Sequence, residues 1–278
     1  YYEKERLKKA EDPKALLIYK AEYCFTIEEA LIRQGDNIFP REELTEQFAN
    51  LEILKTGSPI ETGSLIWETK KVDDNYINTA KWQKNPNGKI LIKEHPYTDE
   101  FGMKFKNLYV GGIDSIDIGT GDSAQDSKAS DSEKARLSDF CIVIKKRVFG
   151  QSEPEYVAMY KDRPKDPREA YENAAKLLTY YGCQAVLEAT RTAIITYFRD
   201  KKYMNLLMKR PRSTMPDVAK GNSNMLGAPA TVKTILHYRE LIYDYILDYY
   251  HNLHFIEMVN QLLGYSDEKK KEFDIVAA

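Results

Sequence analysis

Residues 108–119 read Leu-Tyr-Val-Gly-Gly-Ile-Asp-Ser-Ile-Asp-Ile-Gly, and this stretch decides how the rest of the chain is interpreted. Its apolar composition is typical of a buried strand, yet it contains Asp114 and Asp117. An unpaired carboxylate is costly to bury, and the usual compensation is a basic partner, a helix N-terminus or a divalent cation. No basic residue lies within the stretch, so the sequence makes a metal ion a candidate.

Downstream of this stretch, apolar segments alternate with amphipathic ones. Asp166, Pro167 and Glu169 form a helix start, and Gly182 is a natural stop for that helix. Further helices are predicted over 192–202 and 231–253. The predicted strands are 108–118, 139–148, 156–162, 184–189 and 204–208. This order predicts an α/β fold in which helices flank a mixed sheet.

The N-terminal third has a different texture. A charged helix is predicted over 3–22, and a capping box formed by Thr26 and Glu29 predicts a second helix that ends near Gly35. Pro40 favours the start of a short helix, and short strands are predicted over 64–68 and 89–93. We therefore expect a linker region over 1–105, with helices and short strands, followed by a domain over 106–278.

Composition narrows the class of protein. The chain has 278 residues and a formal net charge of −2, which gives no overall electrostatic attraction to nucleic acid. Its cysteines, Cys24, Cys141 and Cys183, lack metal-binding spacing and are interpreted as reduced structural thiols. Without a spanning segment or signal peptide, we expect a soluble intracellular protein with no membrane partner. The first residue is Tyr1 and the last residues look like a helix just beginning, so we expect an excised fragment of a longer protein.

Three acids stand where a strand or helix should be apolar: Asp114, Glu188 and Asp274. If the strands that carry Asp114 and Glu188 are neighbours, the two acids meet at one edge, and a helix can bring Asp274 against them. Like charges this close repel unless they are protonated or bridged by cations, and hard divalent cations prefer oxygen ligands. The alternative is a structural network in which Arg191 or a lysine neutralises the first two acids.

Basic clusters and long loops surround these acids in the sequence. We expect Lys145 and Lys146, and with them Lys209, Arg210 and Arg212, to contact DNA phosphates, while a solvated surface is the alternative. The polar segments 119–138 and 213–230 follow predicted strands, so they are expected to flank a site. His251 and His254 have helical ligand spacing but are interpreted as exposed helix histidines.

Three short patterns carry a resemblance to a known family. They are Tyr-x-Gly-Gly-x-Asp at 109–114, Val-Leu-Glu-Ala at 186–189 and Phe-Asp-x-Val-x-Ala at 273–278. Together they resemble the RNase H-like nuclease domain of the large terminase subunit of tailed phages. Residues 21–30 also look like the segment that links the packaging ATPase to the nuclease in that family.

The resemblance implies a metal-binding and catalytic triad of Asp114, Glu188 and Asp274. It adds Asp139 as an accessory acid, with Asp117 as a further accessory candidate, although 119–138 is longer than the family pattern. It also implies two Mg²⁺ or Mn²⁺ ions per site with substrate, and endonucleolytic cleavage of concatemeric viral double-stranded DNA during packaging. The implied location is the cytoplasm of the infected bacterial host.

The implied partners are DNA, the ATPase domain of the same polypeptide, the small terminase subunit and the capsid portal. No Gly-x-x-x-x-Gly-Lys-Ser/Thr loop occurs, so no ATP hydrolysis is expected from this chain. One alternative is a non-catalytic domain that keeps the fold and serves for docking or DNA binding in the packaging motor. Another is a nucleotide-binding module of the actin or sugar-kinase type, for which the residues after Leu108 are too few.

Overall fold

A computed structural model describes the chain over residues 2–9, 19, 23, 25, 37–53, 60–72, 75–116, 139–188, 192–210, 225–229, 231–266 and 273–278. The strands are β1 (Glu61–Val72), β2 (Asn75–Lys84), β3 (Ile90–Ile92), β4 (Tyr109–Asp114), β5 (Phe140–Lys146), β6 (Glu155–Asp162) and β7 (Ala185–Leu187). The α-helices are α1 (Tyr2–Lys9), α4 (Arg41–Ile53), α6 (Pro167–Tyr181), α7 (Ala193–Asp200), α8 (Val232–Tyr249), α9 (Ile256–Gly264) and α10 (Asp274–Ala277). Two 3-10 turns, η3 (Met204–Leu206) and η6 (Tyr250–Asn252), complete the described elements.

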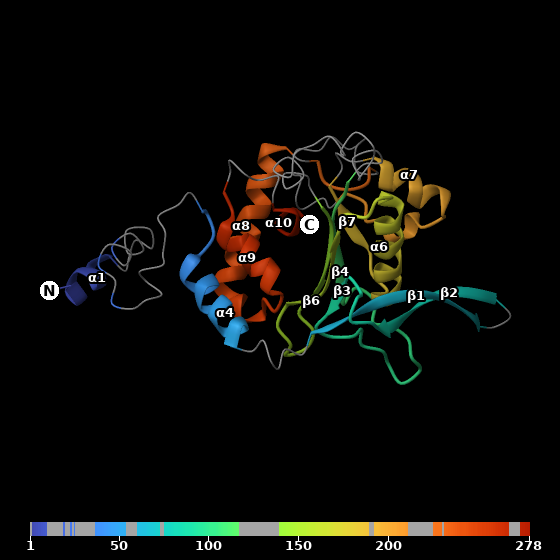
Figure 1. Cartoon of the computed structure of the whole chain (residues 1–278), viewed down its shortest axis with the longest axis horizontal. Coiled ribbons are helices and arrows are strands. Elements are labelled where there is room, and N and C mark those ends of the chain that lie inside the picture. Colours follow the sequence, from blue (N-terminus) through green and yellow to red (C-terminus); the bar gives the residue numbers. More distant parts are fainter. Residues whose placement is uncertain are drawn as a thin grey trace.

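One curled, mixed sheet organises the fold, which confirms the predicted α/β class. Its strand order is β2-β1-β3-β6-β5-β4-β7, and β4 and β7 form the parallel pair while the other neighbours are antiparallel. Helices α6 and α7 cover one face, and α4, α8, α9 and α10 lie on the other (Figure 1). The predicted site strand β4 therefore lies between β5 and β7, with a helical layer on each side.

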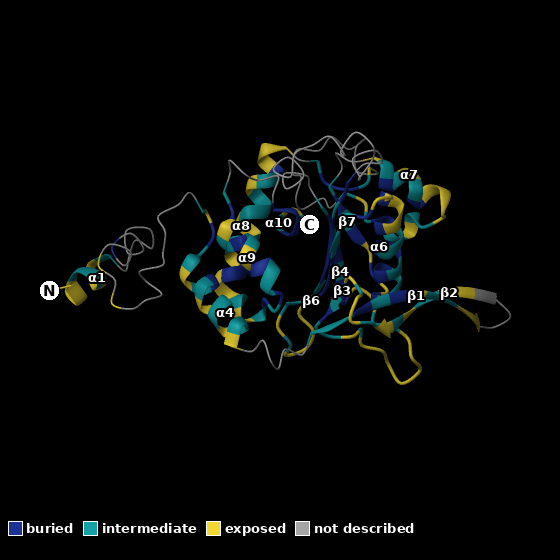
Figure 2. Cartoon of the chain, viewed as in Figure 1, coloured by how far each residue is buried: buried dark blue, intermediate teal, exposed yellow. Residues whose placement is uncertain are grey.

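Each face of the sheet has its own hydrophobic core, and the sheet between them is the most deeply buried layer (Figure 2). Ile113, Tyr171 and Phe198 belong to the core under α6 and α7. Cys141 and Phe255 belong to the core under α4, α9 and α10. Alternation along β4 follows from the two-residue period of a strand, so residues 109, 111 and 113 are buried while 110, 112 and 114 are half-buried. The half-buried side is the one that faces α8 and α10.

Local signals correctly predict several elements. The Asp166 side chain accepts a hydrogen bond from the backbone N–H of Arg168, and Gly182 adopts a left-handed conformation with φ 65° just past the helix. These are the caps that the sequence predicts for α6, and they satisfy backbone groups that a helix end leaves without partners. Strands β4 to β7 and helices α7 and α8 also fall within the ranges predicted for them, apart from a residue or two at some ends. Helix α4 begins directly after Pro40, as predicted, but at 13 residues it is longer than the short helix expected there.

Other elements differ from the predictions. The predicted strand 204–208 is instead the 3-10 turn η3 followed by Leu207, which makes one isolated bridge to Ala185. Strand β2 and helix α9 were not predicted, and β1 runs well beyond the predicted 64–68. Strands β1, β2 and β3 come from the predicted linker region, yet they extend the sheet that holds β4. The capping box at Thr26 and Glu29 lies outside the described residues.

Two broader expectations concern membranes and thiols. Within the described ranges, no helix combines the length and apolar character needed to cross a bilayer. Cys141 and Cys183 are free and buried, as expected for structural thiols, while Cys24 lies outside the described residues.

Candidate metal centre

Asp114 and Glu188 are brought together by the parallel pairing of β4 and β7. Ile113 is in register with Leu187, and the backbone N–H of Glu188 donates to the carbonyl of Ile113 over 3.2 Å. The two acids are therefore the next residues on adjacent parallel strands, at the same edge of the sheet. The first and fourth predicted strands of the domain are thus neighbours, which is the condition under which the sequence allows the two acids to meet.

Asp274 reaches this edge because α10 lies directly on β4. A Cβ atom added to Gly112 would stand only 2.8 Å from the carbonyl carbon of Ala278 and closer still to its oxygen. Only glycine leaves room for the helix to approach the strand this closely. Phe273 and Ile275 are buried beside Asp274, and the Ile275 backbone N–H donates to Oε1 of Gln261 over 2.8 Å. These contacts fix Asp274 at the start of α10.

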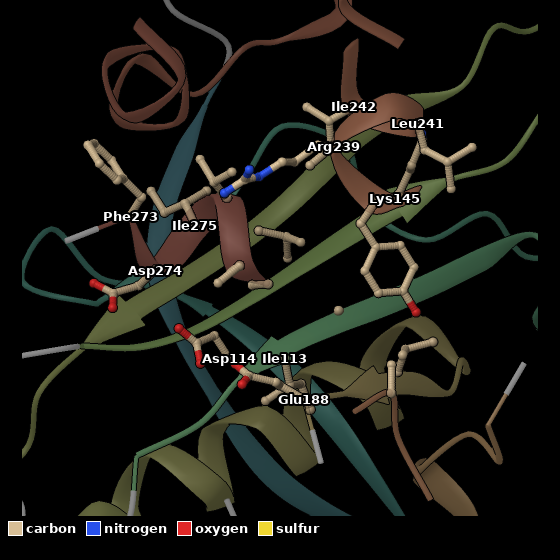
Figure 3. Close-up of a pocket in the computed structure, with 18 of the residues that line it drawn as sticks. Ile113, Asp114, Lys145, Glu188, Arg239, Leu241, Ile242, Phe273, Asp274 and Ile275 are labelled. Atoms are coloured by element: carbon tan, nitrogen blue, oxygen red, sulfur yellow. The ribbon is translucent and has the colours of Figure 1, made fainter. Parts of the chain in front are cut away.

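Cys141 lies close enough to Asp114 and Asp274 for both charges to affect the pKa of its thiol. Cys141 is paired with Asp114 in the β4–β5 register and is fully buried. Burial raises the pKa of the Cys141 thiol well above its usual range, and the nearby carboxylates of Asp114 and Asp274 raise it further. The same pocket is lined by Asp114, Glu188 and Asp274, and Figure 3 shows their carboxylates gathered at one end of it.

The negative charge of the Asp274 carboxylate is disfavoured by its surroundings. It is only 5% exposed, and burial raises its pKa to about 6, with the charge of Asp139 adding to the rise. The backbone N–H of Asp139 and the ammonium of Lys161 act in the opposite direction but do not cancel the effect. Asp274 therefore lacks full compensation for its negative charge, which is the condition that a bound cation would relieve.

Asp139, the predicted accessory acid, has a partner of its own. Lys161 lies 3.3 Å from Asp139 and 2.7 Å from Glu257 on α9. This ion-pair network holds Asp139 beside Asp274 and neutralises part of its charge. Lys161 could not be identified from the sequence, because nothing local connects a lysine on β6 with an acid that precedes β5.

The side chains at this end of the pocket indicate which kind of cation could bind there. Three carboxylates from three separate segments supply the hard oxygen ligands that Mg²⁺ and Mn²⁺ prefer. Among the described residues, however, no three His, Cys, Asp or Glu side chains stand close enough together to hold one ion. The arrangement is therefore an open one, suited to ions held by one or two carboxylates with water and phosphate oxygens in the other positions.

The pocket next to these acids is large and mostly apolar. Its volume is about 790 Å³, and it runs between β4, β5 and β7 on one side and α8 and α10 on the other. Lys145 lines it, and Figure 3 places this lysine at the opposite end from Asp114 and Asp274. The acids thus mark one mouth of a cavity that continues under α8.

The predicted phosphate contacts on β5 face the interior. Lys146 is buried, and its ammonium lies 2.8 Å from Glu94 and 3.1 Å from Glu155. This pairing already satisfies its charge and argues against a phosphate contact. Lys145 points into the cavity, with its Nζ 3.9 Å from the ring centroid of Tyr245. We therefore place neither lysine on the exposed surface.

Lys209 and Arg210 lie beside β7 instead. The segment that carries them pairs with residues 225–228 through a Lys209–Leu226 bridge, and the Ala228 backbone N–H donates to the carbonyl of Leu187. Residues 225–229 therefore flank Glu188, as expected for the end of the predicted loop 213–230. Lys209 is exposed, so it can reach solvent near the acids. Other predicted residues, Arg191, Arg212 and Asp117, lie outside the described residues.

The histidines form ion pairs away from the acids. The Nε2 atom of His251 lies 2.8 Å from Glu153, and that of His254 lies 2.7 Å from Glu155. Only His251 is exposed, because His254 is half-buried against Glu155. The two histidines therefore pair with Glu153, which precedes β6, and with Glu155, its first residue.

Comparison with known proteins gives no match to a protein-family model and no match to a curated protein sequence.

Proposed function

We propose that this chain is a divalent-metal-dependent endonuclease that hydrolyses phosphodiester bonds of double-stranded DNA, with Asp114, Glu188 and Asp274 as metal ligands and catalytic groups. One observation carries the proposal. Acids from β4, β7 and α10, segments far apart in the sequence, line the same end of one pocket. Carboxylates concentrated in this way are expensive unless cations compensate them, and catalysis is the common reason for such an arrangement.

The residues have distinct roles in this proposal. Asp114 lies on β4, the strand that contacts both β7 and α10, and is proposed to contact both ions. Glu188 is proposed to hold one ion from β7, and Asp274 the other from α10. Two bound ions would activate a water molecule and stabilise the leaving oxygen of the scissile phosphate. Asp139 orients Asp274 through its backbone N–H, so it is proposed to position that ligand and not to act on substrate.

Two basic residues near Glu188, Lys209 and Arg210, could contact an anionic substrate. Exposed Lys209 lies on the segment next to β7, near Glu188, and is proposed to contact the DNA backbone together with Arg210. Arg210 also donates from Nε to the carbonyl of Gly227 over 3.1 Å, which holds it on the segment that flanks the site. Contacts of this kind bind phosphates without reading base sequence.

The finer assignment follows from the same residues. We propose that the domain has an RNase H-like fold and cuts concatemeric viral DNA as the nuclease of a tailed-phage packaging motor. What supports this is the mixed sheet with acids on adjacent parallel and antiparallel strands, and the three short patterns that resemble the large terminase subunit. In that setting the ATPase domain, the small subunit and the portal would be its partners.

A non-catalytic DNA-binding or docking domain is the second candidate. It is favoured by the finding that no three potential ligands in the described part of the chain are assembled around one point. Both candidates bind DNA, but they differ in what the acids do. The nuclease needs the acids for cleavage, whereas a docking domain would bind DNA equally well or better without their negative charge.

Incubation of supercoiled plasmid with the protein in Mn²⁺ or Mg²⁺ separates the two. We expect nicked and linear products that disappear with EDTA and in Asp114→Asn, Glu188→Gln and Asp274→Asn variants. Glu153→Gln is the matched control, because Glu153 is an exposed acid paired with His251 on the surface. Intact plasmid at high protein and Mn²⁺, or cleavage that survives Asp114→Asn, would overturn the nuclease.

A further inference from the structure

The cavity beneath α8 has the size and lining of a small-molecule site. Its volume of about 790 Å³ lies within the range of about 300 to 1,000 Å³ that is usual for ligand pockets, and its walls are mostly apolar. Protein interiors contain few voids larger than a water molecule, so packing alone does not explain a space of this size. The acids of the proposed metal site lie at one end, and the opposite end, around Lys145, is a different chemical environment.

Helix α8 forms both the closed end and the roof of the cavity. Tyr245 and Ile246 are buried, and the hydroxyl of Tyr245 donates to the carbonyl of Pro154, just before β6, over 3.0 Å. About two helical turns earlier, Tyr238 lines the cavity and is only half-buried. The helix therefore seals the cavity against β5 and β6 at the Lys145 end, and its preceding turns form the roof.

The floor of the cavity places Lys145 beside an apolar surface. Lys145 on β5 pairs with Val110 on β4 in the antiparallel register, so both side chains lie on the same face of the sheet. Val110 and, on β7, Val186 line the cavity and are half-buried. A ligand whose charged group meets Lys145 would therefore rest its apolar body on these two valines.

The ammonium of Lys145 has no acidic partner among the described residues. It contacts two aromatic rings, with its Nζ 3.9 Å from the centroid of Tyr245 and 5.3 Å from that of Tyr156. Burial lowers the pKa of Lys145 to about 8, because the rings compensate its charge only in part. The second cation in the described lining, Arg239, differs in that it donates to the hydroxyl of Tyr265 over 2.6 Å.

A further polar group lies along the roof. The hydroxyl of Tyr238 is buried and has no hydrogen-bond partner within the described part of the chain. Tyr238 is roughly 10 Å along the helix axis from Tyr245, whose ring covers Lys145. At the far end of the cavity, the acids repel a second negative charge. The lining thus fits a molecule with one anionic end and an apolar body that has room for a polar group.

We propose that the cavity binds a small amphipathic monoanion, of the class of long-chain or aromatic carboxylates. Its anionic group pairs with the ammonium of Lys145, and its apolar body lies between α8 and the floor formed by Val110 and Val186. Neither a metal ion nor a phosphodiester takes part in these contacts. The inference therefore holds or fails separately from the nuclease proposal.

The test compares two dyes that share one apolar body. 1-Anilinonaphthalene-8-sulfonate carries a negative sulfonate, and N-phenyl-1-naphthylamine is the same ring system without it. Fluorescence titration of the full chain, with EDTA present, should show a single bound dye per chain. The sulfonate dye should bind about 10- to 100-fold more tightly, as expected of a hydrogen bond to a charged group. Dodecanoate should displace both dyes, and dodecanol should compete more weakly.

Matched variants separate the charge from the cavity. Lys145→Met should remove the preference for the sulfonate dye and leave binding of the neutral dye nearly unchanged, whereas Lys145→Arg should keep the preference. Val110→Phe should weaken both dyes by about tenfold or more, because the ring occupies the floor. Lys201→Met is the control, since Lys201 is an exposed lysine at the end of α7, 5.8 Å from the ring centroid of Tyr197.

Three results would overturn the proposal. They are equal affinities of the two dyes for the parent chain, a preference for the sulfonate that survives Lys145→Met, and affinities that Val110→Phe leaves unchanged. Lys145→Gln should behave like Lys145→Met, and it carries the test if thermal unfolding shows that the methionine variant does not fold.

Discussion

Replacing Gly112 with alanine should separate the position of Asp274 from the stability of the domain. The added Cβ would lie 2.8 Å from the carbonyl carbon of Ala278, inside the 3.0 Å that real Cβ atoms essentially never cross. Strand β4 is held by β5 and β7 on both sides, so it cannot retreat. The end of α10 must therefore lift from the sheet by on the order of 1 to 2 Å.

The expected effect is larger on the site than on folding. Overpacking in a rigid core costs about 1 to 3 kcal/mol, but here the atoms that collide belong to a one-turn helix at the end of the described chain. We expect the free energy of unfolding to fall by about 1 kcal/mol or less. Displacement of a ligand by an ångström or more should weaken Mn²⁺ binding about 10- to 100-fold and reduce plasmid cleavage by about 100-fold.

Gly264→Ala is the matched control, because its added Cβ meets only a ring carbon of Phe273 at an ordinary 3.5 Å. Isothermal titration with Mn²⁺, plasmid cleavage and thermal unfolding should be measured on both variants and on the parent chain. If Gly112→Ala bound Mn²⁺ and cut DNA like the parent, the contact of α10 with β4 would not position Asp274. The assignment of Asp274 as a ligand would then be wrong.

Three further outcomes follow from the ion pairs and the basic segment. Lys146→Met should destabilise the protein by about 3 kcal/mol in urea unfolding, because it leaves the carboxylates of Glu94 and Glu155 without their buried cation. Lys145→Met should not destabilise it, because within the described part of the chain the Lys145 ammonium has no acidic partner and contacts only aromatic rings. Equal losses for the two lysines would refute this distinction. Burial alone would raise the pKa of Glu155, but hydrogen bonds from His254 and Lys146 outweigh it and hold that pKa at about 2, below the usual 4.5. The charged form is favoured in the folded state, so this stabilisation is complete above pH 4.5 and is lost as the pH falls towards 2. Discounted for partial exposure, it amounts to about 1 to 2 kcal/mol, and Glu155→Gln should flatten the acid limb of a stability-against-pH curve. Finally, Lys209→Ala with Arg210→Ala should reduce the slope of log affinity for DNA against log salt by about 2, and an unchanged slope would exclude these residues from the phosphate contacts.

Local chemistry explains which elements the sequence predicts. Helix α6 begins and ends with side chains and a glycine that satisfy its own backbone, so its bounds are visible within the segment itself. Strand β2 is polar and partly exposed, and it exists because it pairs along its length with β1. Helix α9 has no side-chain hydrogen bond at its N-cap residue Phe255, so it gives no starting signal. Strand β2 and helix α9 therefore form because of pairing and packing with distant segments, which no short sequence pattern reveals.

The run 204–208 shows the limit of apolar patterns. A short apolar segment fits a strand or a tight helical turn equally well by composition. Here only Leu207 is fully buried, and it forms one bridge to Ala185 while the residues before it close a 3-10 turn. The positive φ of Lys202, 62°, directs the chain after α7 into that turn.

The acids of the candidate site were visible in the sequence because each interrupts an apolar segment. What surrounds them was not, since Lys161 reaches Asp139 from another strand and Lys146 turns inward to Glu94 and Glu155. The sequence shows directly which residues are charged. Whether a charged residue on a strand faces the core or the solvent depends on the register of the whole sheet. A basic cluster on a strand therefore predicts phosphate contacts poorly until the register is known.

Gly112 lies under the end of α10, the short helix that carries Asp274 and also lines the cavity. Asp114 and Asp274 lie at one end of the cavity and Lys145 at the other, and residues of α10 line the same cavity. Because α10 is a single turn held mainly by Phe273, Ile275 and its contact with Gly112, any group that fills the cavity also fixes the helix that carries Asp274. By reciprocity, cations that bind Asp274 would stabilise α10 against the sheet and favour occupation of the cavity. The proposed metal site and the cavity would thus be coupled through one short helix, and the strength of that coupling would be set by how closely Gly112 lets the helix approach.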